Sequence, residues 1–110
     1  MTVDEIAAIC SAEFPEVVVC AFVADARRGR IRLDLRDGSC LDIHQTSGGG
    51  YSYHWQRASD AIRFNNAPHF DHLETAPHHM HVGSEVRPSD IRGVTEEDVR
   101  KVLQYVSAML

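Results

Sequence analysis

The chain has 110 residues, of which 44% are hydrophobic and 25% charged, as in an ordinary globular protein. Its net charge of −5 argues against a general nucleic-acid coat, but ten of its eleven cationic residues are arginines, whose planar fork suits phosphate. No apolar run approaches the roughly 18 residues that a membrane span needs, and the acidic N-terminal stretch lacks a signal peptide's pattern. We therefore expect a single cytoplasmic domain over residues 1–110, without contact to a membrane.

A helix is predicted near each end of the chain. Thr2 and Glu5 have capping-box spacing, apolar residues then recur at helical intervals as far as Phe14, and Pro15 ends the helix. The second helix begins after Thr95, a candidate N-cap. Its buried stripe is predicted to consist of Val99, Val102, Leu103, Val106 and Leu110.

Strands are expected between the two helices. Residues 17–24 are continuously apolar, which predicts a strand buried on both faces. A hairpin follows, whose three-residue loop at 36–38, with Gly38 left-handed, pairs Leu33 with Leu41 and keeps the apolar side chains on one face. A two-residue turn would mix the faces, so the longer loop is preferred.

A second hairpin is predicted from strands at residues 51–57 and 61–67. A two-residue turn at positions 59 and 60 sets Trp55 opposite Phe64 on the apolar face. The same register predicts a polar patch on the other face, with His54 opposite Asn65 and Gln56 opposite Arg63.

The remaining segments are loops, a short strand and a connection. Residues 47–50 are a glycine-rich loop, residues 67–77 a proline-containing loop and residues 85–92 a polar connection. The strand at 79–82 alternates, with Met80 and Val82 inward and His79 and His81 outward. The element order predicts an α+β fold, a mainly antiparallel sheet of four or five strands with both helices packed on it.

Histidine is concentrated in residues 51–83, which contain six of the seven in the chain. Its unperturbed pKa lies near neutrality, so a cluster indicates proton transfer or a metal. The shared parity of the second hairpin and the 79–82 strand brings the candidate catalytic residues together: His54, Arg63, His79 and His81. The candidate binding residues are Asn65, Asn66, His69 and His78, with His69 at the rim.

Three functions fit this pattern. A metal-independent ribonuclease needs a base, an acid and a cation, which His54, His81 or His79, and Arg63 can supply. A divalent metal site can be built on the His79-x-His81 pair, completed by His54, His69 or His78, although no HExxH motif or cysteine set accompanies it. In a non-catalytic binding module the histidines instead bond to loop carbonyls, and no cofactor is needed.

Three segments, YSYHWQ, IRFNNAPHF and APHHMHVG, resemble the signature of the TumE family of toxin–antitoxin toxins. The family pattern is Tyr-x-Tyr-His-Trp, Arg-aromatic-Asp-Asn-Ala-Pro-His and Pro-His-His-x-His-x-Gly. It falls on Tyr51, Tyr53, His54 and Trp55; on Arg63, Phe64, Asn66, Ala67, Pro68 and His69; and on Pro77, His78, His79, His81 and Gly83. Asn65 stands where the family usually has Asp, and if that Asp is a base or a metal ligand, Asn65 cannot replace its charge.

The resemblance implies a function and a partner. A toxin of this kind is neutralised by a helix-turn-helix antitoxin encoded beside it. Together with the histidine and arginine patch, it leads us to expect action on RNA or translation, as a monomer or a homo-oligomer.

Overall fold

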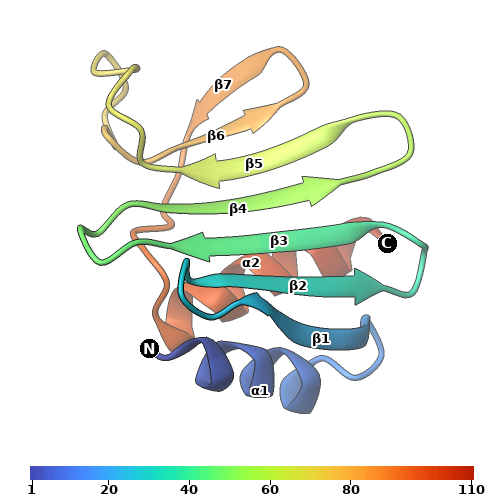
Figure 1. Ribbon diagram of the computed structural model, residues 1–110. Helices are drawn as coiled ribbons and strands as arrows, with labels where there is room; N and C mark the ends of the chain where they lie inside the picture. The colour runs from blue at the N-terminus through green and yellow to red at the C-terminus, as the bar shows by residue number, and fades with distance from the viewer.

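The computed structural model describes residues 1–110, in which two helices flank a single antiparallel sheet (Figure 1). The sheet has seven strands: β1 (Val18–Asp25), β2 (Arg30–Leu35), β3 (Cys40–Gln45), β4 (Tyr51–Gln56), β5 (Ala61–Asn65), β6 (His79–Val82) and β7 (Glu85–Pro88). Their order in the sheet is their order in the chain, and every neighbouring pair is antiparallel. The predicted α+β class is confirmed, whereas the expected four or five strands were too few.

Both helices form where the capping signals place them. In α1 (Val3–Glu13) the Thr2 hydroxyl accepts from the Glu5 backbone N–H, and the Glu5 carboxylate accepts from the Thr2 N–H. In α2 (Glu96–Met109) the Thr95 hydroxyl accepts from the Asp98 N–H. These bonds satisfy backbone donors that the first helical turn leaves without partners.

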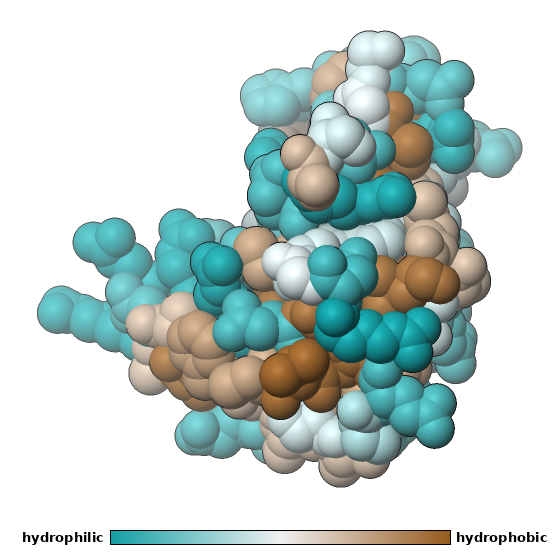
Figure 2. Space-filling model, turned by 90° about the vertical axis from the view of Figure 1, so that its right-hand side faces the viewer, coloured by the Kyte–Doolittle hydropathy of each residue, from teal (hydrophilic) through white to brown (hydrophobic).

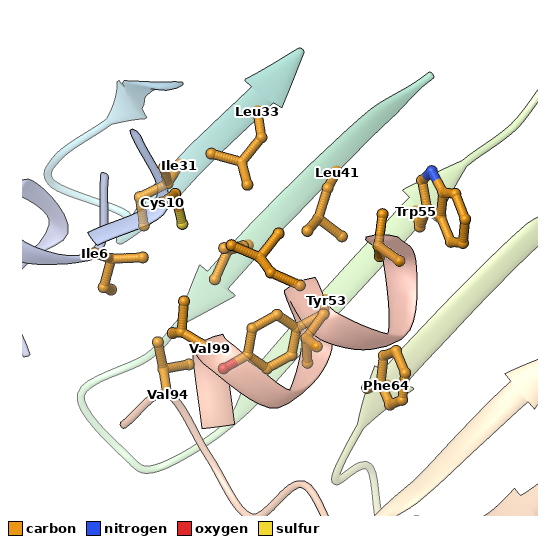
Figure 3. Packing of buried hydrophobic residues seen from close by; sticks show 14 of the residues in the cluster. Ile6, Cys10, Ile31, Leu33, Leu41, Tyr53, Trp55, Phe64, Val94 and Val99 are labelled. Atoms are coloured by element: carbon orange, nitrogen blue, oxygen red, sulfur yellow. The ribbon is translucent and has the colours of Figure 1, made fainter. Parts of the chain in front are cut away.

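The helices lie against one face of the sheet and enclose a cluster of 21 buried hydrophobic residues. Figure 3 shows Ile6 and Cys10 of α1 and Val99 of α2 packing toward the side chains of the central strands, among them Tyr53 and Trp55. The opposite face carries no helix, and α2 lies behind the sheet in Figure 1. We call this uncovered side the open face.

The register of the first hairpin, β2 with β3, is the predicted one. Leu33 pairs with Leu41 and Ile31 with Ile43, and all four side chains are buried. Gly38 has φ +86°, the left-handed conformation that the three-residue loop requires. The expected pairing is therefore confirmed together with its cause.

Strand β1 corrects the expectation of a strand buried on both faces. It forms the edge of the sheet, and Val19 is 72% and Phe22 40% exposed. Val19 is the extra residue of a bulge, because Val18 pairs with Leu35 while Cys20 already pairs with Asp34. A continuous apolar run records β-propensity and does not show whether both faces are covered.

The second hairpin, β4 with β5, has a register two residues away from the predicted one. Trp55 pairs with Ile62, and His54 with Arg63. The turn is one residue earlier, since the Arg57 N–H donates to the carbonyl of Asp60. A shift of two residues leaves every side chain on the same face, so alternation alone does not distinguish these registers.

Strand β7 was not predicted, because residues 85–92 were assigned to a polar connection. It pairs with β6 across a turn in which Gly83 has φ +59°. Its sequence, Glu-Val-Arg-Pro, contains one apolar residue and a proline, a composition found at sheet edges, where strands are hard to recognise.

Hydrophobic residues reach the surface in scattered patches. In the side view of Figure 2, brown patches lie among hydrophilic residues in the lower half of the molecule, at the height of α1 and the first strands. Val19 and Phe22 of β1 are among the exposed large hydrophobic side chains. Neither helix combines the length and the apolar character needed to cross a membrane.

Candidate functional site

Histidine and arginine side chains form a row across the open face. His54 of β4 lies directly opposite Arg63 of β5, which in turn lies opposite His81 of β6. Directly paired residues of antiparallel strands project from the same face, and neighbouring strands are about 4.8 Å apart. The His54–Arg63–His81 row therefore spans two strand spacings, with Arg63 on the strand between the two histidines.

The Arg63 side chain fixes the tautomer of His54. Its Nε and Nη2 lie 3.0 and 2.9 Å from Nδ1 of His54. A guanidinium group only donates, so Nδ1 accepts and carries no proton. The remaining nitrogen, Nε2, then donates to the side-chain oxygen of Gln56 at 3.2 Å. His54 is neutral in this arrangement, as assigned from its hydrogen-bond partners.

His81 is oriented through its neighbour His79. Nδ1 of His79 donates to the Pro77 carbonyl at 2.9 Å, so its Nε2 is an acceptor. Nε2 of His81 lies 3.1 Å from that acceptor and donates to it, which leaves Nδ1 of His81 unprotonated and without a protein partner. Burial, His79 and Arg63 together lower the pKa of His81, so this imidazole is neutral at pH 7.

The loop between β5 and β6 covers part of the row. The Phe70 ring centroid lies 4.8 Å from that of His79 and 5.5 Å from that of His81, edge to face. His79 projects from the predicted face, but this loop leaves it only 1% exposed. His69 is exposed on the same loop, next to Phe70. Strand alternation predicts the face of a side chain and not what folds over it.

The three other candidate binding residues make structural bonds. The Asn65 side-chain oxygen accepts from the Ala67 N–H at 3.0 Å, which forms a turn at the end of β5. Asn66 accepts from the Tyr51 N–H and donates to the Gly49 carbonyl. Asn65 lies on the open face beside the row, whereas Asn66 joins two loops at the end of the sheet.

His78 is not brought to the row. It stacks on Tyr51 with ring centroids 5.8 Å apart, on the helix side of the sheet. The Tyr51 hydroxyl donates to the Ile91 carbonyl at 2.8 Å and therefore accepts from Nδ1 of His78 at 2.9 Å. Desolvation and Arg92 lower the pKa of His78. Tyr51 and Tyr53 are buried, so neither ring can stack on an RNA base.

A groove beside the row was missed at the sequence level. It lies between the β3–β4 loop at residues 46–50 and the segment at 66–68 that follows β5, and its volume is about 570 Å³. We call it the loop groove. Its floor on the open face consists of His44, Ser52, Arg63 and Asn65. The pairing of β3 with β4, which brings His44 next to Ser52, was not predicted. Both residues alternate with apolar neighbours in their strands, and this alternation would have placed them on the same face of the sheet.

The structure contains no group of three or more His, Cys, Asp or Glu side chains arranged to hold a metal ion. The two nitrogens of the predicted metal pair, Nε2 of His79 and Nε2 of His81, face each other in a hydrogen bond. The chemistry that this geometry offers is proton transfer beside a cation.

Comparison with known proteins identifies a family. The model of a family described as Toxin TumE matches residues 12–110, which include all seven strands and α2. No curated protein and no solved structure matches the chain. The family match extends well beyond the three motif segments in residues 51–83.

Proposed function

Because the chain belongs to the TumE family of toxins, we propose that it is a ribonuclease toxin whose open face cleaves RNA. Membership of a toxin family implies a cognate antitoxin, and we propose a helix-turn-helix protein encoded beside it. The toxin would act in the cytoplasm as a single domain over residues 1–110. The observation that carries the proposal is the His54–Arg63–His81 row, which places an arginine on the strand between two histidines, on one face of the sheet.

The proposed reaction is an attack within the RNA. Nδ1 of His81 takes the proton of a ribose 2′-hydroxyl, and the 2′-oxygen forms a bond to phosphorus. Arg63 turns from His54 to the non-bridging phosphate oxygens and stabilises the negative charge of the phosphorane. The bond from phosphorus to the 5′-oxygen then breaks. The products are a 2′,3′-cyclic phosphate and a 5′-hydroxyl, the ends expected of metal-independent cleavage.

His54 is the proposed acid of this reaction. When Arg63 turns to the phosphate, Nδ1 of His54 is released, and the nearby negative charge favours its protonation from solvent. The resulting imidazolium donates a proton from Nε2 to the departing 5′-oxygen. His54 is then neutral again, because it has passed a proton from solvent to the 5′-oxygen, while His81 has gained one proton. Release of that proton to water, and exchange of the remaining His54 proton from Nδ1 to Nε2, restore the starting state.

The test is induced expression of the toxin with and without its neighbouring gene. Growth should arrest, and the neighbour should relieve the arrest. The His54→Ala and His81→Ala variants should each lose the arrest, and the purified wild-type protein should leave 2′,3′-cyclic phosphate ends on RNA. His72→Ala is the matched control, because His72 is exposed on the covering loop and belongs to no part of the row. Folded His54→Ala and His81→Ala variants that still arrest growth would contradict the catalytic role.

A second candidate function is a toxin that binds its target without catalysis. It is supported by two histidines that bond within the protein, His78 to Tyr51 and His79 to the Pro77 carbonyl. This candidate predicts arrest by the folded His54→Ala and His81→Ala variants and intact RNA. The experiment above therefore separates the two functions.

A further inference from the structure

The loop groove adjoins the row and shares Arg63 with it. Its two walls are the β3–β4 loop and the segment after β5, which project from the same end of the sheet, at the left of Figure 1. Its volume of about 570 Å³ lies within the range of small-molecule sites, about 300–1,000 Å³. A ligand in the groove would therefore touch the guanidinium group that we assign to the scissile phosphate.

Hydrogen bonds hold the walls of the groove in place. The Asn66 side chain donates to the Gly49 carbonyl at 3.0 Å and accepts from the Tyr51 N–H at 3.1 Å, so one residue ties the two walls together. Within the β3–β4 loop, the Thr46 hydroxyl accepts from the Gly50 N–H at 2.9 Å. The groove is thus preformed, and a ligand need not order its walls.

The glycines of the β3–β4 loop have different reasons to be glycine. Gly49 has φ +89°, a conformation that other residues rarely adopt, and a Cβ at Gly50 would lie 3.0 Å from the Thr46 hydroxyl oxygen. Gly48 has neither restriction, since its φ is not positive and a Cβ there would meet no atom within 4 Å. The fold therefore accepts a side chain at Gly48, and that side chain would enter open space beside the groove.

The chemistry of the lining suits an anion with polar edges. Arg63 is cationic, the His44 ring can donate a hydrogen bond, and no aspartate or glutamate lines the groove, in a chain whose net charge is −5. The Ser52 hydroxyl, the Asn65 amide nitrogen and the His44 ring make no hydrogen bond within the protein, and Nη1 of Arg63 is also free of one. These groups can donate to phosphate, ribose or base oxygens.

We propose that the loop groove binds one nucleotide of a single-stranded RNA, next to the phosphodiester held by Arg63. The choice of RNA as ligand rests on the proposed function. The ring of Tyr51 in the lining is buried and cannot stack on the base, which leaves the His44 ring and the Arg63 guanidinium as flat surfaces and the polar groups of the lining as partners for the edges of the base. The groove thus selects the nucleotide beside the cleaved bond.

The test is an NMR titration of the full chain with the four nucleoside 5′-monophosphates, and with inorganic phosphate as the reference ligand. At least one nucleotide should shift the amide signals of Gly48, Ser52 and Asn65 in a saturable way, whereas phosphate should shift only the Arg63 side-chain signal. Gly48→Leu should weaken nucleotide binding by about tenfold or more and leave phosphate binding unchanged. Ser47→Leu is the matched control, since Ser47 is also exposed in the same loop but does not line the groove.

Three results would overturn the proposal. One is nucleotide binding that neither shifts the groove amides nor responds to Gly48→Leu. Another is an equal loss of binding in Gly48→Leu and Ser47→Leu, which would indicate a general disturbance of the loop. The third is that no nucleotide binds. Binding needs no catalysis, so a nucleotide that binds the groove of a protein unable to cleave RNA would refute the proposed reaction alone. RNA cleavage without nucleotide binding would refute the groove alone.

Discussion

The hydrogen bond between His81 and His79 fixes which ring nitrogen of His81 carries the proton. Nδ1 of His79 is held by the Pro77 carbonyl, so its Nε2 can only accept, and His81 must donate from Nε2. The free nitrogen of His81 is therefore always Nδ1. In the same way, the hydrogen-bond partners of metal-bound histidines fix which ring nitrogen carries the proton. In the proposed reaction His79 is thus a positioning residue, and His81 is the base.

Replacing His79 should release the tautomer of His81. In His79→Ala, nitrogen NMR shifts of His81 should report a mixture of the two neutral tautomers in place of one, because the acceptor is gone. RNA cleavage should fall by about tenfold or more. His79→Gln, whose side-chain oxygen can accept from His81, should recover part of both effects. A single unchanged tautomer in a folded His79→Ala protein would contradict the positioning role of His79.

The Trp55 side chain depends on one buried hydrogen bond. Its indole N–H donates to the Ser39 hydroxyl at 2.8 Å, and that hydroxyl donates to the Asp37 carboxylate. Ser39→Ala should therefore lower the free energy of unfolding by about 1–3 kcal/mol, because the buried N–H loses its acceptor. Urea denaturation measures the change. Ser59→Ala, in an exposed turn, is the control and should change stability by less than about 0.5 kcal/mol.

At the scale of the elements, the stability of α2 depends on the hydrogen bonds of its first turn. The Thr95 hydroxyl accepts from the Asp98 N–H, and the buried Asp98 carboxylate accepts from the Thr95 hydroxyl and from the Arg92 N–H. Thr95→Ala removes the cap and should cost about 1 kcal/mol of stability, measured as a lower melting temperature. Thr95→Ser keeps the oxygen and should cost less. Equal losses in both variants would show that the methyl group, and not the cap, matters.

A hairpin register could be predicted from the sequence only where the alternative pairing would have moved apolar side chains to the other face of the sheet. The first hairpin was predicted correctly, because only a three-residue loop kept Leu33 and Leu41 on one face. The second was wrong by two residues, because Trp55 is equally well placed opposite Phe64 or Ile62. Hairpin edges such as β7 carry little apolar signal, so local sequence does not separate them from loops.

For the candidate site, the face of each side chain could be predicted from the sequence, but the loops that surround the site could not. Alternation placed His54, Arg63 and His81 on one face, and an error of two residues did not disturb that result. The cover that Phe70 forms over His79 was not predictable, because loop residues 66–78 have no period that indicates where they fold. The loop groove depends on the pairing of β3 with β4, which lies across the glycine-rich loop.

On the scale of the whole molecule, two histidines make stability depend on pH. The folded state lowers the pKa of His78 and His81 below the unfolded value of about 6.5. Between the two values the unfolded chain binds more protons, so the free energy of unfolding falls as pH drops below about 6.5 and levels off below the lowered values. Glu5 and Glu13, whose pKa values are lowered by bonds to Thr2 and Arg100, add a loss only below about pH 4.5.

Urea denaturation at about pH 7.5 and pH 5 measures this dependence, in a window that only histidine titration fills. The wild-type protein should unfold at a lower urea concentration at the acidic pH. His81→Gln should show a smaller difference between the two conditions, because one of the two linked groups is gone. His72→Gln should behave like the wild type. An unchanged midpoint between the two conditions in the wild-type protein would refute the linkage.

The strand order has a consequence for how the protein reaches its fold. Since each strand pairs with the one before it in the chain, nearly all sheet contacts are short in sequence, and short contacts favour fast folding. Long-range closure is left to the docking of α2, where Arg100 forms a double hydrogen bond with Glu13 of α1 across 87 residues. The sheet can therefore assemble strand by strand during synthesis, with the helix closing the core last.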